Sequence, residues 1–173
     1  MSEAAKFSTV ELLRNGQQIE IRALRPDDQA NMVAAVGRTG APSLYRRFFA
    51  VKRDFSAKEI SFFLNVDFTD HVALVAVTKE GGRDVIIGGG RYVVARPGAA
   101  EFAFTVEDRY QGQGIGSALL RHLVALARRA GLKVLIAEVL PDNLPMLKVL
   151  ENSGLSLDKR QEAGVMHVAL RLG

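Results

Sequence analysis

The residue types and spacing that most directly indicate chemistry are found in a glycine-rich loop, Gln111-Gly112-Gln113-Gly114-Ile115-Gly116. The loop lies between an apolar run, Phe102 to Val106, and a helical pattern that continues to Ala130. Glycines let the backbone approach a ligand closely, and the first amides of a helix have no partner within the helix. Together with Ser117, the loop therefore predicts a cradle for a ligand that carries phosphates.

Two other phosphate-binding motifs fit this loop less well. A P-loop needs a lysine followed by Ser or Thr at the end of the glycine run, whereas Gly116 is followed by Ser117 and Ala118. The dinucleotide-binding motif needs Gly-x-Gly-x-x-Gly and an acidic residue about 20 residues later. Glu138 almost suits the acidic position, but the third glycine comes one residue early and few residues follow Glu138. A dinucleotide is therefore the weaker alternative.

The surrounding sequence predicts a mixed sheet flanked by helices, which would hold the loop in place. Alternating or continuous apolar runs predict strands at 19–23, 71–78, 85–94, 100–106, 134–139, 157–160 and 165–170. Capping residues and helical spacing predict helices at 26–38, within 43–66, at 115–130 and from Asn143 onward. We interpret Met1 to Thr9 as a loose leader, so that residues 1–17 are the leader and the start of a single domain at 18–173.

Composition excludes several classes of function. The 173 residues are 48% apolar and 24% charged, which is ordinary for one globular domain. Without cysteine the chain has no thiol nucleophile and no thiolate-ligated metal. No apolar run approaches the roughly 20 residues of a membrane span, and we expect a cytoplasmic protein that binds no membrane. The net charge of +4 includes no sustained basic run, which argues against nucleic acid and suits an anionic ligand.

The motif Gln-x-x-Gly-x-Gly between a strand and a helix resembles the signature of the GNAT acyltransferase superfamily. The resemblance continues through the pattern at 115–130, the strand at 134–139, Asn143 and Gly154-Leu155. It implies an α/β fold with a central mixed sheet of six to seven strands and about four flanking helices. It also implies that the loop binds the pyrophosphate of acetyl-CoA, and that the strands after Ala100 and Lys133 splay apart to admit the pantetheine arm.

An acetyltransferase of this kind needs a base, because only the neutral form of an amine attacks a thioester. A carboxylate on an apolar strand is a natural choice, since burial raises its pKa toward neutrality. Both Glu101 and Glu138 fit this description. The resemblance favours Glu101, on the strand just before the signature, where many GNAT enzymes have their general base. The alternatives are a solvent-facing Glu101 at a strand edge, and a Glu138 in a buried ion pair with an N-terminal arginine.

The resemblance assigns further residues to the coenzyme and also reveals one departure. It implies that the backbone amides of Phe104, Thr105 and Val106 pair with the pantetheine. Asn143 would contact the coenzyme or a bound water, although it could equally be a helix cap. Many family members have a tyrosine in the last helix that protonates the leaving thiolate. That position is Leu150 here, so water would protonate the thiolate, or the thiolate would leave unaided.

Within the family, the segments Ser43 to Phe49, His71 to Ala76 and Ala100 to Ala103 resemble bacterial protein-lysine acetyltransferases of the Pat type. Such enzymes modify the active-site lysine of acyl-CoA synthetases, which implies a protein lysine as the acceptor. We expect the protein to be a monomer or a homodimer. A small-molecule amine is the alternative acceptor, and a coenzyme-binding module without catalysis is the alternative function. No metal is expected, because the three histidines lack the spacing of a helical metal pair.

Overall fold

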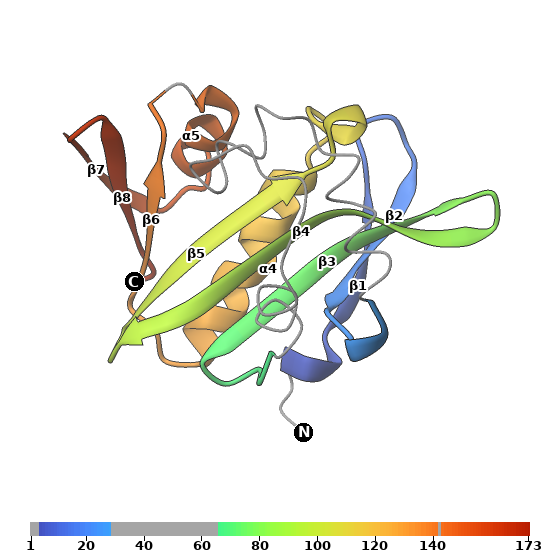
Figure 1. The fold of residues 1–173 in the computed structure, drawn as a ribbon, viewed down its shortest axis with the longest axis horizontal. Helices are drawn as coiled ribbons and strands as arrows, with labels where there is room; N and C mark the ends of the chain where they lie inside the picture. Colours follow the sequence, from blue (N-terminus) through green and yellow to red (C-terminus); the bar gives the residue numbers. More distant parts are fainter. Residues whose placement is uncertain (1–3, 29–65, 142) are drawn as a thin grey trace.

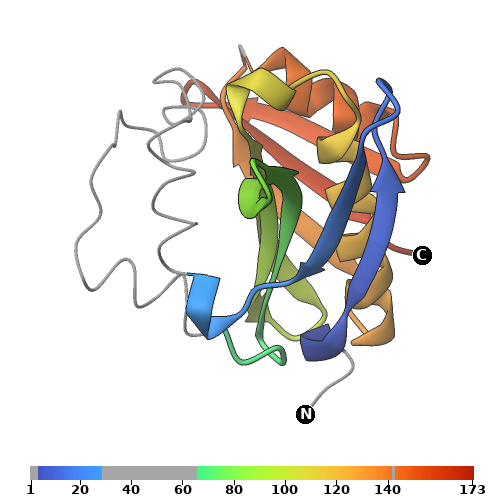
Figure 2. The same ribbon diagram turned by 90° about the vertical axis from the view of Figure 1, so that its right-hand side faces the viewer.

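A computed structural model of the chain describes residues 4–28, 66–141 and 143–173. These residues form one sheet with the strand order β1-β2-β3-β4-β5-β6-β8-β7, and a long helix, α4, lies across one of its faces (Figure 1, Figure 2). The strands are β1 (Ser8–Leu12), β2 (Gln18–Ala23), β3 (His71–Glu80), β4 (Arg83–Arg96), β5 (Ala99–Val106), β6 (Val134–Val139), β7 (Ser156–Glu162) and β8 (Val165–Arg171). The helices are α4 (Ile115–Arg129) and α5 (Leu144–Glu151), with short 3-10 turns η1 (Ala4–Lys6), η2 (Pro26–Asp28) and η3 (Asp108–Tyr110).

The topology places the glycine loop at one end of a parallel pair of strands. All neighbouring strands run antiparallel except β5 and β6, which are parallel. Parallel neighbours require a crossover connection. Here the chain leaves β5, passes through η3 and the glycine loop, crosses the sheet as α4 and returns as β6 (Figure 1). The mixed α/β class predicted from the sequence is thereby confirmed.

Strand β1 raises the number of strands to eight, where the sequence predicts six or seven. It pairs with β2 from Ser8 to Leu12, so Ser8 and Thr9 belong to the sheet and not to a loose leader. None of its residues is buried, and Val10 and Leu12 are 64% and 68% exposed. A strand at the edge of the sheet without a buried face lacks the apolar alternation from which strands are predicted.

Two of the predicted helices, α4 and α5, lie within the described residues. The helices predicted within 43–66, and most of the helix predicted at 26–38, lie outside them, and only Pro26–Asp28 are described, as η2. Helix α4 ends as predicted, because its C-cap Ala130 is followed by Gly131 at φ +83°. A left-handed glycine directly after the cap is the usual end of an α-helix.

The core lies between α4 and the sheet, and two glycines of β4 determine how closely the two approach. Leu119, Leu123 and Ala127 repeat every four residues along α4 and have no exposed surface. A Cβ atom added at Gly90 would lie 2.9 Å from Cδ1 of Leu123, and one at Gly88 would lie 3.4 Å from Cγ2 of Ile115. The missing side chains therefore let α4 pack directly on β4, which sets the position of its first turn.

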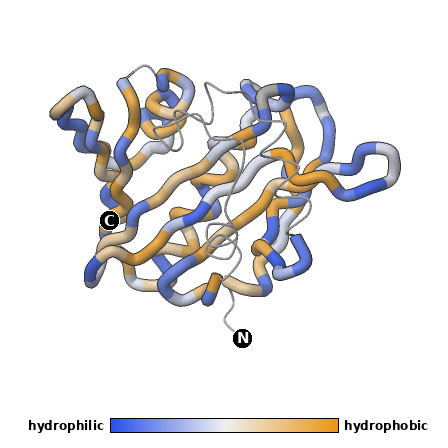
Figure 3. The backbone as a smooth tube through the Cα atoms, viewed as in Figure 1, coloured by the Kyte–Doolittle hydropathy of each residue, from blue (hydrophilic) through white to orange (hydrophobic). Residues whose placement is uncertain are grey.

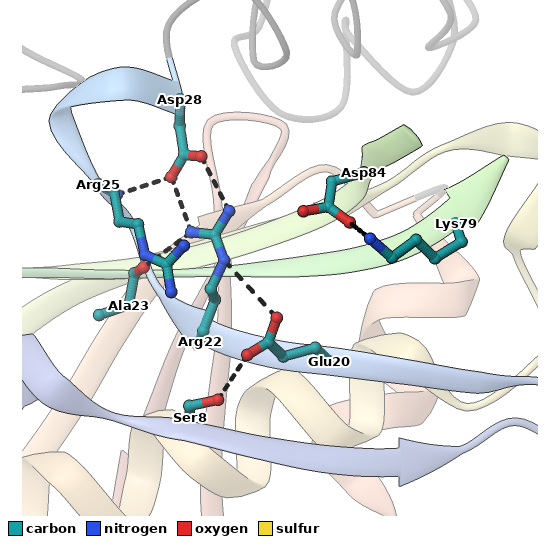
Figure 4. Close-up of polar contacts among 8 residues, drawn as sticks. All are labelled: Ser8, Glu20, Arg22, Ala23, Arg25, Asp28, Lys79 and Asp84. Atoms are coloured by element: carbon teal, nitrogen blue, oxygen red, sulfur yellow. Dashed lines mark hydrogen bonds and ion pairs between the residues drawn. The ribbon is translucent and has the colours of Figure 1, made fainter. Parts of the chain in front are cut away.

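Hydrophobic residues follow the central strands, and hydrophilic ones gather at the turns (Figure 3). One polar cluster is nevertheless buried, where β2 leads into η2 (Figure 4). Nη1 and Nη2 of Arg22 each donate to an oxygen of Asp28 at 2.9 Å, and the backbone N–H of Arg25 donates to the same carboxylate at 2.6 Å. The side chains of Arg22 and Asp28 are both 5% exposed. This bidentate ion pair fixes the path of the chain as it leaves the sheet.

Candidate functional site

The two parallel strands separate soon after they meet. β5 and β6 pair at Ala99↔Val134, Ala100↔Leu135 and Glu101↔Ile136, and not beyond (Figure 1). On its other side β5 stays paired with β4 as far as Val106, and β6 stays paired with β8 as far as Val139. The two strands therefore separate without losing their regular structure, because each stays paired with its other neighbour while the edges that face each other move apart.

The alternation of backbone hydrogen bonds determines which groups face the opening. Glu107 donates its backbone N–H to the oxygen of Ile87 at 2.8 Å. In an antiparallel ladder every second residue bonds to the partner strand, so Thr105 is directed at β4, whereas Phe104 and Val106 are directed at the opening. The oxygen of Val106 accepts a hydrogen bond from Nε2 of Gln111 at 3.2 Å. Of the three amides that the resemblance assigns to pantetheine, those of Phe104 and Val106 point toward the opening between the strands.

A cavity of about 270 Å³ occupies the opening between the strands and extends to the glycine loop. Most of the residues predicted to bind a ligand line it: Phe104, Thr105, Val106, Gln111, Gly112, Gly114, Ile115, Gly116, Ser117, Glu138 and Asn143. Gln113 and Glu101 are not among its lining residues. The structure thus brings residues of β5, the loop, β6 and α5 together around one cavity.

The glycine loop has the geometry of an anion cradle. Gly112 and Gly114 have φ values of +81° and +96°, in the left-handed region that glycine adopts without strain. Gly114 is the N-cap of α4, and no side chain caps the helix there. The next amides, of Ile115, Gly116 and Ser117, have no partner within the helix and carry its partial positive charge. All three residues line the cavity.

Neither candidate base is buried. Glu101 is exposed and alternates with the core residues Ala100 and Phe102, so its side chain is on the face of the sheet opposite α4. Ile136, the partner of Glu101, shares that face, as does Glu138 two residues further along β6. The side chain of Glu138 is 59% exposed, and its Oε1 lies 3.8 Å from Nδ1 of His167. The proposed burial of Glu138 with an N-terminal arginine is therefore wrong, because α4 covers only the other face.

Asn143 and Leu150 show what α5 contributes. Oδ1 of Asn143 accepts the backbone N–H of Met146 at 3.4 Å, so Asn143 caps the helix while also lining the cavity. Leu150 has no exposed surface and belongs to the core. The position that carries a tyrosine in many GNAT enzymes thus supplies no proton donor here.

Four polar residues that line the cavity are not predicted from the sequence: Arg14, Tyr110, Lys148 and Asn152. Arg14 lies on the turn between β1 and β2, where its backbone N–H donates to the oxygen of Gln113 at 3.2 Å and its Nη1 to that of Gly112 at 3.1 Å. The contact between Arg14 and Gly112 joins residues 98 positions apart in the sequence. No local pattern signals such a contact.

A buried histidine, His71, is on the same face of the sheet as Glu101, two strands away. His71 pairs with Val93, and Val93 pairs with Glu101, so the three form one row across β3, β4 and β5. His71 is 7% exposed, and its Nε2 lies 2.9 Å from Nη1 of Arg91. Burial, and then the charge of Arg91, lower the pKa of His71 from 6.5 to about 4. The ring is neutral at pH 7, with Nε2 accepting from Arg91.

Neither a metal site nor a membrane-spanning helix occurs among the described residues. No group of three His, Asp or Glu side chains that could hold a metal ion occurs in the described ranges. Neither α4 nor α5 has the length and apolar composition to cross a bilayer.

Comparison with known proteins identifies relatives of this chain. A model of the acetyltransferase (GNAT) family matches residues 41–155. The acetyltransferase Pat of Mycolicibacterium smegmatis is 34% identical over 156 residues, which are 89% of this chain and 46% of that protein. The chain thus spans about half the length of that relative. The crystal structure of the GNAT domain of S. lividans PAT is similar with a TM-score of 0.85 and 35% identity, over 95% of this chain and 96% of that one.

A more distant structure shows the same fold. It is yncA from Salmonella typhimurium, solved with its cofactor acetyl-CoA. Its TM-score is 0.71 at 19% identity, over 90% of this chain and 94% of that one.

Proposed function

The chain belongs to the GNAT acetyltransferase family, and we propose that it transfers an acetyl group from acetyl-CoA to an amine, with a protein lysine as acceptor and Glu101 as general base. The observation that carries this proposal is the opening between β5 and β6, whose lining ends at the uncapped first turn of α4. A long, thin ligand with a phosphate group at one end fits such a site.

Coenzyme binding follows from the arrangement of the cavity. The pyrophosphate binds the amides of Ile115, Gly116 and Ser117, because a helix N-terminus favours negative charge. The pantetheine arm lies along β5 and bonds to the amides of Phe104 and Val106 as an added strand would. The thioester then lies toward the point where β5 and β6 meet.

The transfer step needs one proton acceptor near that point. Glu101 removes a proton from the acceptor ammonium, and the neutral nitrogen attacks the carbonyl carbon of the thioester. The tetrahedral intermediate collapses, the C–S bond breaks, and coenzyme A leaves as a thiolate. The second proton of the attacking nitrogen passes through water to that thiolate, and Glu101 returns its own proton to the solvent. Glu138 is the alternative base, because it lines the cavity whereas Glu101 does not.

The choice of a protein lysine rests on the resemblance to enzymes of the Pat type and on the likeness to Pat of M. smegmatis. Such enzymes acetylate the active-site lysine of acyl-CoA synthetases. Two carboxylates on the face of the sheet away from α4, Glu101 and Glu138, suit the approach of a positively charged lysine from that face. A small-molecule amine remains the alternative acceptor.

The test is release of coenzyme A thiol from acetyl-CoA in the presence of different amines. We expect an acyl-CoA synthetase to support sustained release and to gain the mass of one acetyl group on a lysine. Faster release with a polyamine or an amino sugar would replace the protein lysine by a small amine. Tight binding of acetyl-CoA without thiol release on any acceptor would favour a coenzyme-binding module, for which buried Leu150 at the usual tyrosine position is the supporting observation.

A further inference from the structure

The phosphate cradle has no positively charged side chain of its own. Residues 111–117 consist only of glutamine, glycine, isoleucine and serine. Coenzyme A carries several negative charges on its phosphates, and the partial charge of one helix terminus is only about half an elementary charge. A cation from elsewhere in the fold would therefore strengthen binding.

Arg109 is next to the loop in sequence, but its guanidinium is paired with two glutamates. Its Nε is bonded to the buried carboxylate of Glu107, and its Nη2 lies 3.0 Å from Oε1 of Glu80. It does not line the cavity, and within the described part of the chain the two cationic lining residues are Arg14 and Lys148. Of these, Arg14 is the one bonded to the cradle itself.

The turn that carries Arg14 is held firmly in place. The backbone N–H of Leu13 donates to the backbone oxygen of Gln17 at 2.8 Å, and the backbone N–H of Gly16 donates to the backbone oxygen of Leu13 at 2.9 Å. The side chain of Leu13 is 5% exposed and belongs to the core. Two bonds from Arg14 then join the turn to Gly112 and Gln113 of the loop. The guanidinium is thus fixed beside the cradle by both backbone and side chain.

We propose that Arg14 is a phosphate-binding residue for the coenzyme, supplied by the β1–β2 turn to a glycine loop that lacks a cation. The guanidinium has five N–H donors, and its bond to Gly112 leaves others to meet a phosphate, which arginine can bind through two parallel hydrogen bonds. Arg14 lies outside residues 41–155, which match the family model. This inference rests on the proposed function, because it takes coenzyme A as the ligand.

The test measures the dissociation constant of coenzyme A by calorimetry at several salt concentrations. Arg14→Gln removes the charge while its amide can still donate to the oxygen of Gly112. We expect the dissociation constant to rise about tenfold to a hundredfold, the range of a charge-assisted hydrogen bond, and to become less dependent on salt. Arg14→Lys restores the charge and should recover part of the affinity. Arg129→Gln, at the far end of α4, removes the same charge and should have little effect.

The outcomes separate the two proposals. If the wild type binds coenzyme A and Arg14→Gln binds it within twofold, the role of Arg14 is wrong and the proposed function stands. If Arg14→Gln weakens binding but keeps the wild-type salt dependence, Arg14 only positions the loop, and the proposal is again wrong. If the wild type itself does not bind coenzyme A, both proposals are overturned.

Discussion

Glu101 of β5 and Ile136 of β6 form the last backbone pair before these two parallel strands separate. Glu101 therefore lies at the closed end of the opening, and its side chain is on the face of the sheet that α4 leaves uncovered. The cavity begins at the next residue, Phe102, and runs toward the glycine loop. A ligand bound at the loop and extended along β5 would thus bring its far end to Glu101.

Glu101→Gln is expected to lower kcat by about 100-fold to 10,000-fold, the usual contribution of a general base. Affinity for coenzyme A should stay the same, because Glu101 does not line the cavity. Thiol-release kinetics and calorimetry on the same preparation measure these effects, and an unchanged kcat would remove Glu101 from the mechanism.

Glu138→Gln is the matched comparison, because Glu138 is on the same face and lines the cavity. If Glu101 is the base, this variant should keep most of kcat and alter mainly KM for a positively charged acceptor. A larger fall of kcat in Glu138→Gln than in Glu101→Gln would assign the base to Glu138.

Gly114→Ala is expected to weaken coenzyme binding as well as stability. Gly114 has φ +96°, and an added Cβ atom would meet nothing within 4 Å, so backbone strain of about 1–2 kcal/mol is the main effect. That strain acts on the amides that hold the phosphate. Urea unfolding and calorimetry with coenzyme A check the two effects.

Gly131→Ala is the control at the other end of α4. Gly131 has φ +83° and equally free space for a Cβ atom, but it does not line the cavity. We expect a similar loss of stability with unchanged affinity for coenzyme A. Equal losses of affinity in both variants would mean that Gly114 acts only through the stability of the helix.

The parts of the site that follow from local sequence were predicted, whereas the parts that depend on distant contacts were not. The buried face of α4, including Ile115, Leu119 and Leu123, follows from helical spacing, and the cradle follows from glycines before a helix. Arg14 has no such signal, because a turn between two strands reaches the cradle only in the folded sheet. The expected burial of Glu138 is wrong, because an apolar strand suggests two covered faces, whereas Glu138 is on the face away from α4.

His71 is expected to make the protein less stable in acid. Its pKa in the folded state, about 4, is below the ordinary value of 6.5, so the unfolded chain binds a proton first as the pH falls. Stability is therefore full above pH 6.5 and is lost between pH 6.5 and about 4. One pKa unit corresponds to about 1.4 kcal/mol, which gives a loss on the order of 3 kcal/mol.

His71→Gln removes the imidazole that takes up a proton in acid, while the amide oxygen of glutamine can still accept a hydrogen bond from Arg91. Urea unfolding from pH 7 to pH 4 should show a shallower loss of stability than in the wild type. His167→Gln, with a side chain that is 36% exposed, is the control and should follow the wild type. Parallel pH curves for His71→Gln and the wild type would show that His71 is not the acid-sensitive group.

Asp28→Asn is expected to destabilise the fold by about 3–5 kcal/mol, because it leaves the buried guanidinium of Arg22 without its counter-charge. Burial alone would raise the pKa of Asp28, but the hydrogen bonds from Arg22 and from the backbone N–H of Arg25 together hold it below its ordinary value. The carboxylate therefore stabilises the fold above about pH 4 and loses this effect as the pH falls further.

The exposed pair Lys79–Asp84, drawn in the same view (Figure 4), is the control, since its side chains are 72% and 51% exposed. Asp84→Asn should change stability by less than about 1 kcal/mol. Urea unfolding at pH 7 measures both variants, and equal losses would mean that burial of the Arg22–Asp28 pair adds nothing to its effect.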